Sequence, residues 1–279
     1  MSVTISAALV KELRDATNVG MMECKKALQD AEGDKDKAFQ LLRERGLAIA
    51  TKKAERTAAD GLIDATVNGG GKVGAMIEVN CETDFVARNE TFQAFVSQLL
   101  GKALASDEDL TVSCKDEVAA KVAEIGENLV LKRHIRFEQT GAGVVASYVH
   151  LGGKVGVLLQ VGCEQDASVQ NEGFKNMVKD ITHHIAFANP QALDRSGIDA
   201  ATIENERQLF AKQAEGKPAN VVEKIVEGKV NKFYAQVCLL EQVFVKDSDV
   251  TIGELLARTG KELGDTFRIE RYVRYEIGA

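Results

Sequence analysis

The chain has 279 residues, of which 45% are hydrophobic, and it carries a formal net charge of −7 with a pI near 5.3. This length and apolar content suffice for two or three globular domains. The acidic balance argues against direct binding of nucleic acid or of an anionic membrane, because both need concentrated Lys and Arg. We therefore expect a protein partner or a small ligand.

The N-terminal stretch MSVTISAALVKELRD lacks a basic region before its short apolar run, and no run in the chain approaches membrane-spanning length. These features predict a cytoplasmic protein. The five cysteines are widely separated and form neither a CxxC pair nor a Cys/His cluster. We expect them to be buried thiols, with no metal or other cofactor.

Residues 1–50 are predicted to form a separate three-helix module. The amphipathic stretches SAALVKELRDATN, MMECKKALQDA and DKDKAFQLLRERG are broken next to Gly20 and Gly33, and Asp34 follows as an N-cap. Such a small bundle has a thin core, so its exposed apolar residues are candidates for binding. Residues 51–59 are predicted to be a helical or extended linker.

A duplication organises the rest of the chain. GGKVGAMIEVNCETD (70–84) recurs as GGKVGVLLQVGCEQD (152–166), with nine of fifteen positions identical at an offset of 82. LKRHIRFE (131–138) recurs as IERYVRYE (269–276) at an offset of 138, so the second copy contains an insertion. The boundaries that follow are 60–140 for the first subdomain, 141–190 with 246–279 for the second, and 191–245 for the insertion.

Each copy is predicted to contain a strand hairpin, helices and a final strand. GLIDATVN and KVGAMIEVN flank the glycines at 69–71, as in a hairpin. ETFQAFVSQLLGKAL has helical spacing with Asn89 as its N-cap, and Thr251 with Glu254 has capping-box spacing. The predicted fold class is α+β, with two subdomains of antiparallel sheet and helices packed side by side.

The insertion is predicted to be an antiparallel helical hairpin, or coiled coil. Ile203, Phe210 and Ala214 share one face of its first arm, and the sequence EGKP (215–218) forms the turn. The apolar face of the second arm contains Val222, Val226, Val230 and Phe233. We expect this arm to pack on the body at its base, with a surface available to a second chain.

CETDFVARNETF (81–92) contains the main difference between the two copies. Phe85 and Val86 correspond to Ala167 and Ser168, so the shared scaffold does not require a phenylalanine at this position. A side chain added just after a strand lies where loops present functional groups. Burial of the ring is equally favourable in a core or in a complex, so local packing and exposure for binding both remain open.

These residues also carry a family resemblance. LVKELRDATNVGMMECKKAL (9–28), KKAERTAADG (52–61) and EVNCETDFVARNETF (78–92) resemble bacterial elongation factor Ts, the guanine-nucleotide exchange factor of elongation factor Tu. The similarity covers nearly the whole chain, including the duplicated core and the helical insertion. It implies a translation elongation factor that binds elongation factor Tu·GDP and promotes GDP release.

The resemblance also implies site residues. In the family the N-terminal module is similar to ubiquitin-associated (UBA) domains and grips the GTPase domain of Tu, and Arg14, Met21 and Met22 occupy the matching contact positions. From the residues alone, the two methionines would instead fill the module's core.

The run Thr83-Asp84-Phe85-Val86 matches the family's specific motif, and the resemblance implies that all four residues bind Tu. In the family, the pair that matches Asp84-Phe85 is the wedge that enters the Tu GTPase domain and disturbs the magnesium and phosphate site. His150 matches a histidine that contacts Tu away from the nucleotide, although a satisfied surface histidine is an equal alternative.

Other features limit or test this interpretation. Longer family members continue with a C-terminal helix that adds contacts to Tu, and affinity from that helix is not expected here. The four histidines have no metal-ligand or triad spacing, and GGGKV lacks the Ser or Thr of a phosphate-binding loop, so no enzyme is expected. The alternative function is a non-catalytic adaptor that assembles proteins with its N-terminal bundle and arm. A homodimer and a Tu2Ts2 assembly are both compatible with the sequence.

Overall fold

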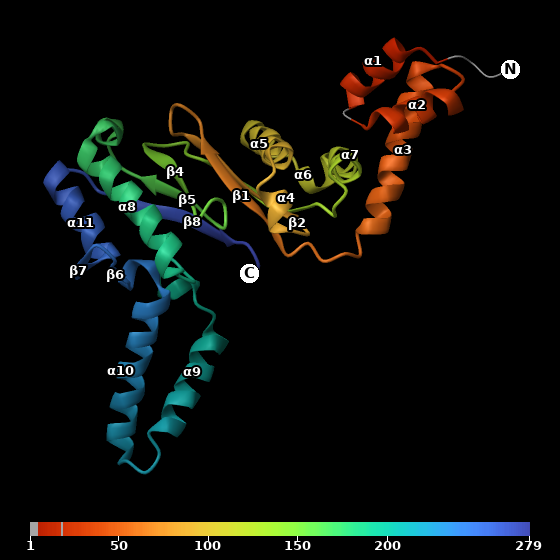
Figure 1. Ribbon diagram of the computed structural model, residues 1–279. Helices are drawn as coiled ribbons and strands as arrows, with labels where there is room; N and C mark the ends of the chain where they lie inside the picture. The colour runs from red at the N-terminus through yellow and green to blue at the C-terminus, as the bar shows by residue number, and fades with distance from the viewer. Residues whose placement is uncertain (1–4, 18) are drawn as a thin grey trace.

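The computed structural model describes residues 5–17 and 19–279, which form an elongated molecule in three parts (Figure 1). Helices at the N-terminal end join a central body of sheets and helices, and a long helical arm projects from the body. This mixture of helices and antiparallel sheets confirms the predicted α+β class. Within the described ranges, no helix is long and apolar enough to cross a membrane.

The N-terminal helices surround a small core of their own. They are α1 (Ala7–Thr17), α2 (Met21–Asp30) and α3 (Lys35–Lys53). Asp34 caps α3 as predicted, because its carboxylate accepts a hydrogen bond from the Lys37 amide at 3.0 Å. The buried residues of this core are Val10, Leu13, Cys24, Ala27, Leu28, Ala31, Ala38 and Leu42. Residues 1–4 and Asn18, which belong to the predicted module, lie outside the described residues.

Helix α3 runs across the predicted boundary between the N-terminal module and its linker. The third predicted helix ends at Gly46, but α3 continues through this glycine and past the predicted boundary after residue 50. Gly46 is buried where α3 packs on α7 (Lys115–Ile125), and Arg43 forms an ion pair with Asp116 of α7. The module is therefore joined to the body by a continuous helix that packs on the first repeat.

The first repeat folds as a three-stranded antiparallel sheet covered by helices. Its strands, in the order β1-β2-β3, are β1 (Asp60–Val67), β2 (Val73–Cys81) and β3 (Val130–Glu138). Its helices are α4 (Asp84–Ala87), α5 (Glu90–Ala105), α6 (Leu110–Ser113) and α7. Asn89 caps α5 as predicted, accepting a hydrogen bond from the Thr91 amide at 2.8 Å. The predicted apolar face of α5 is buried, namely Phe92, Phe95, Val96, Leu99 and Leu100.

The second repeat has the same kind of sheet, in the order β4-β5-β8. Thr251 and Glu254 form the predicted capping box at the start of its last helix. Its strands are β4 (Gly143–His150), β5 (Val155–Gly162) and β8 (Arg268–Glu276), with a small hairpin of β6 (Val243–Phe244) and β7 (Asp247–Thr251). Its helices are η1 (Asp166–Gln170), α8 (Glu172–Ala188), η3 (Leu239–Glu241) and α11 (Ile252–Leu263).

Symmetric contacts join the two repeats. The Ile63 amide donates a hydrogen bond to the Gly153 carbonyl, and the Val145 amide donates one to the Gly71 carbonyl, both at 2.7 Å. These two bonds are equivalent under the offset of 82. Between the sheets lies a shared apolar core whose buried members form equivalent pairs: Ile63 with Val145, Met76 with Leu158, and Phe137 with Tyr275. The two repeats therefore bury one common interface.

The arginines at this interface are exchanged between the repeats. The guanidinium of Arg133 in β3 lies 3.9 Å from the ring centre of Tyr275 in β8. In the equivalent contact, Arg271 of β8 lies 4.0 Å from the ring centre of Phe137 in β3. Each repeat thus supplies a cation to an aromatic ring of the other, an attraction that is strengthened by partial burial.

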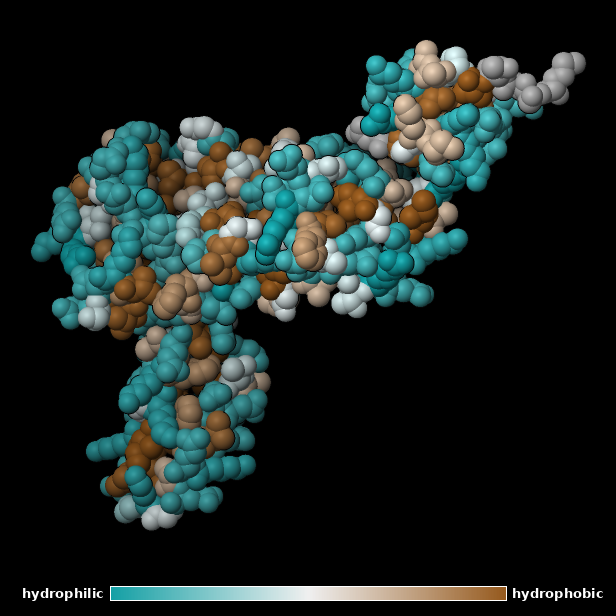
Figure 2. Space-filling model, viewed as in Figure 1, coloured by the Kyte–Doolittle hydropathy of each residue, from teal (hydrophilic) through white to brown (hydrophobic). Residues whose placement is uncertain are grey.

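The insertion forms the predicted helical hairpin, with α9 (Ala200–Gln213) and α10 (Ala219–Val237). It leaves the second repeat after α8, through η2 (Arg195–Gly197), and returns to η3. At its base the Arg195 guanidinium donates two hydrogen bonds to the Glu241 carboxylate, at 2.6 and 2.7 Å. Apolar side chains remain exposed along the arm, including Leu209 and Val221, and Figure 2 shows apolar surface there.

Candidate functional site

The candidate site is the turn that follows β2. Phe85 is the second residue of the four-residue helix α4, and its side chain is 80% exposed. The residues around it are anchored, since Cys81 and Ala87 are buried and Val86 packs against the core of the first repeat. The alternative that Phe85 fills a local core is therefore wrong. An aromatic ring stands on the surface, held at both sides by buried neighbours.

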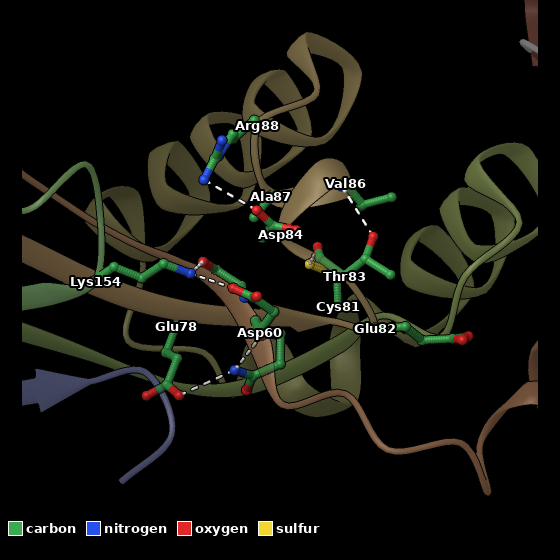
Figure 3. Close-up of polar contacts among 12 residues, drawn as sticks. Asp60, Glu78, Cys81, Glu82, Thr83, Asp84, Val86, Ala87, Arg88 and Lys154 are labelled. Atoms are coloured by element: carbon green, nitrogen blue, oxygen red, sulfur yellow. Dashed lines mark hydrogen bonds and ion pairs between the residues drawn. The ribbon is translucent and has the colours of Figure 1, made fainter.

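The entry to α4 is fixed by hydrogen bonds (Figure 3). The Thr83 hydroxyl accepts from the Val86 amide at 3.3 Å, as an N-cap does. Asp84 forms an ion pair with Arg88 at 3.1 Å. Arg88 was not among the residues predicted from the sequence. Because Arg88 is exposed and Asp84 is partly exposed, this pair contributes little to stability.

Glu127 is the second residue that the sequence reasoning missed. Its carboxylate accepts hydrogen bonds from the amides of Glu82 and Thr83, at 3.0 and 3.1 Å, and from the Thr83 hydroxyl at 2.7 Å. In the second repeat, the Asp265 carboxylate accepts from the amides at 164 and 165, at 3.0 and 3.2 Å. The sequence does contain a sign of this equivalence, because an acid directly follows each of two glycines, 126 and 264, that correspond at the offset of 138.

Beneath the turn, the charged and thiol groups stabilise the fold and are not placed to react. Lys154 of the second repeat forms an ion pair with Asp60 of β1, and this contact lowers the pKa of the Asp60 carboxyl (Figure 3). Burial raises the pKa of the Cys81 thiol to about 12, so the thiol stays protonated and is a poor nucleophile at neutral pH. All five cysteines are free and buried, as predicted. In the part of the chain that the structure describes, no cluster of His, Cys, Asp and Glu is placed to hold a metal ion.

The site lies in a region that matches a known protein family. Residues 82–279 match the family model described as Elongation factor TS. The chain belongs to the elongation factor Ts family. It therefore has a role in translation elongation.

Individual elongation factor Ts proteins are similar along almost the entire chain. That of Clostridium acetobutylicum is 44% identical over 288 residues, which cover 98% of this chain and 92% of the relative. That of Trichlorobacter lovleyi is 40% identical over 293 residues, which cover 99% and 93%. That of Nitratiruptor sp. is 42% identical over 288 residues, which cover 99% and 94%. The resemblance inferred from the sequence motifs is thereby confirmed.

The N-terminal residues that resemble the elongation factor Ts contact positions are on the surface. Met21 and Met22, at the start of α2, are 51% and 74% exposed, so they do not fill the module's core. Arg14 of α1 is also exposed. The N-terminal module lies at one end of the molecule, away from α4 in the body (Figure 1). The structure thus presents two separate surfaces rather than one cluster.

His150 lies at the end of β4, in the second repeat, and is exposed. One of its ring nitrogens, Nδ1, lies 2.8 Å from the Tyr148 hydroxyl, and the ring of Tyr148 in turn packs on His183 of α8 with ring centres 4.2 Å apart. The next residue, Leu151, is 69% exposed. His150 therefore belongs to an aromatic group on the surface of the second repeat, separate from the α4 turn.

Proposed function

We propose that this chain binds elongation factor Tu·GDP and accelerates release of GDP. Membership of the elongation factor Ts family supports this function. The observation that carries it is the exposure of Phe85 on an anchored turn, at a position where the second repeat has Ala167. A ring that adds nothing to the scaffold is suited to a partner.

The proposed mechanism needs no bond-making by this chain. Asp84 and Phe85 enter the GTPase domain of elongation factor Tu and disturb its magnesium and phosphate site. Mg²⁺ demands near-ideal octahedral coordination, so a small displacement of its surroundings weakens GDP binding. By reciprocity, the factor by which this chain weakens GDP binding equals the factor by which GDP weakens binding of this chain. GTP then binds, and this chain dissociates.

The remaining candidate residues provide affinity in this proposal. Thr83 and Val86 hold the wedge, Arg14, Met21 and Met22 contact the GTPase domain from the N-terminal module, and His150 contacts Tu away from the nucleotide. Exposed methionines suit such a surface because their flexible side chains adapt to a partner. The site of action is the cytoplasm, where translation takes place.

Association of this chain with a second copy of itself would use the arm. Its exposed apolar residues, among them Leu209 and Val221, offer a surface for a homodimer or for a Tu2Ts2 assembly. Sedimentation of the chain alone and with elongation factor Tu distinguishes these states from a one-to-one complex.

A stopped-flow measurement tests the proposed function. Elongation factor Tu loaded with a fluorescent GDP analogue is mixed with this chain and an excess of unlabelled GDP. The proposal expects the release rate to rise with the concentration of this chain and to saturate. The adaptor alternative expects a complex in sedimentation with no change in the release rate, and that result would reject nucleotide exchange.

A further inference from the structure

The exposed ring of Phe85 stands on a helix that cannot hold its own shape. Helix α4 has four residues, which is a single turn. A single helical turn is unstable in isolation because nucleation fixes several dihedral angles for one hydrogen bond. The direction of Phe85 must therefore be set by contacts from outside α4.

Val86 and Ala87 pack on the core of the first repeat, and Glu127, in the loop after α7, supplies polar contacts to the start of the turn. Gly126 ends α7 in the left-handed conformation, with φ of 86°, and this turn brings Glu127 to the end of β2. The same carboxylate that accepts from the Glu82 and Thr83 amides also accepts from the Thr83 hydroxyl, at 2.7 Å. A second contact runs in the opposite direction, since the Glu82 carboxylate accepts a hydrogen bond from the backbone amide of Asn128 at 2.7 Å.

The hydroxyl of Thr83 transmits this anchor to α4. A hydroxyl has one hydrogen to donate, and here it is given to Glu127, which leaves the oxygen lone pairs for the amide of Val86. The N-cap of α4 is thus oriented by the carboxylate. Because Val86 directly follows Phe85, the cap bond also constrains the residue that bears the ring.

The second repeat separates the structural part of this arrangement from the specific part. Asp265 holds the equivalent strand end by hydrogen bonds from the backbone amides of Glu164 and Gln165, and it also accepts one from the Thr266 amide. Residue 165 is a glutamine and gives η1 no side-chain cap. A carboxylate that accepts hydrogen bonds from the backbone amides at the strand end is common to both repeats. A hydroxyl at the N-cap that joins the carboxylate to the next helix, with an aromatic ring two residues later, occurs in the first repeat alone.

We propose that Glu127 is a positioning residue for nucleotide exchange: by fixing Thr83 and the cap of α4, it holds Phe85 in the direction in which it enters elongation factor Tu. This inference rests on the proposed function. Glu127 acts through the turn, without contacting the partner. A preorganised ring loses less conformational freedom on binding, so more of its burial energy appears as weakened GDP binding.

The experiment compares Glu127→Gln with Asp265→Asn as its matched control. Each change gives a neutral amide of the same shape in place of a carboxylate that accepts hydrogen bonds from two backbone amides at the end of a strand. Asp265 accepts a third from the Thr266 amide, which follows it directly. We expect similar small changes in thermal stability. Release of labelled GDP should slow about tenfold for Glu127→Gln, on the scale of one hydrogen bond to a charged group, and remain normal for Asp265→Asn. Equal effects of the two changes on GDP release would overturn the proposal.

A double-mutant cycle with Phe85→Ala tests whether Glu127 acts through the ring. In the Phe85→Ala background, Glu127→Gln should cause no further slowing. If the two effects multiply instead, Glu127 acts independently and the inference is wrong. If Phe85→Ala releases GDP at the normal rate, both the wedge and this inference are wrong. If Phe85→Ala slows GDP release and Glu127→Gln does not, the positioning role alone is wrong.

Thr83→Val provides a second variant that keeps both amide contacts of Glu127 and removes only the hydroxyl link. It should accelerate amide hydrogen exchange at Val86 in the free chain and slow GDP release, again without further effect in the Phe85→Ala background. If Glu127→Gln fails to fold, this variant decides the question. Normal GDP release by folded Thr83→Val would refute the proposed link.

Discussion

Replacement of Phe85 by alanine is the most direct test of the wedge. The side chain is 80% exposed in the free chain, so its removal takes little apolar surface out of the fold. If the ring becomes buried in elongation factor Tu, it contributes about 2 kcal/mol there. A loss of this size corresponds to about a 30-fold slower release of GDP at concentrations of the chain below saturation. We therefore expect Phe85→Ala to melt at the wild-type temperature and to be a poor exchange factor.

A second phenylalanine in the same repeat gives the opposite expectation. Phe92 of α5 is fully buried, so Phe92→Ala should lower stability by about 3 to 5 kcal/mol. Its remaining folded fraction should still release GDP at a normal rate per folded molecule. If Phe85→Ala destabilises the chain to a similar extent, or leaves the stopped-flow release rate unchanged, Phe85 is not an exposed wedge.

Three further predictions follow from burial. The double change Met21→Ala with Met22→Ala should weaken calorimetric binding to elongation factor Tu and leave the melting temperature unchanged, since both side chains are exposed; unchanged affinity would remove α2 from the interface. Gly46→Ala should stabilise the chain by about 1 kcal/mol in denaturant unfolding, because alanine favours the helix and its Cβ would lie 3.8 Å from the nearest atoms of α7, an ordinary contact distance. Destabilisation would show that the contact between α3 and α7 cannot accept the methyl group. Burial lowers the pKa of His184 from 6.5, so its contribution to stability is complete above pH 6.5 and is lost as the pH falls toward its folded pKa. His184→Gln should flatten the pH dependence of the melting temperature in this range, and an unchanged profile would assign it to other groups.

The duplication made much of the body predictable. Matching stretches of sequence show that two segments have one fold, and local rules then give the hairpins and the caps at Asn89 and Thr251. The comparison of Phe85 with Ala167 also indicated the site, because it showed which side chain the scaffold can lack. It could not choose between packing and exposure, since the free energy of burying a ring is the same in either setting.

Features that depend on tertiary contacts were missed. The third helical stretch of the sequence, DKDKAFQLLRERG, ends at Gly46, but α3 continues to Lys53, because packing of α3 on α7 outweighs the cost of about 1 kcal/mol of a glycine within a helix. Glu127 is far along the chain from the turn it holds. The acid after each paired glycine marks this position in the sequence, but it does not say which turn the acid contacts. The equivalence of Glu127 and Asp265 becomes informative only when the turn they fix is known.

The exchanged arginines at the interface of the repeats have a consequence for how the body unfolds. Arg133 lies over the ring of Tyr275 and Arg271 over the ring of Phe137, beside an apolar core that both repeats build, so neither half buries its inner surface without the other. The two halves should therefore melt as a single cooperative unit, and a half expressed alone should be insoluble or pair with a second copy of itself. A symmetric pair of identical halves would present two identical turns. Covalent fusion of the halves removes that constraint, and it allows one turn to keep a ring for a partner while the other carries an alanine.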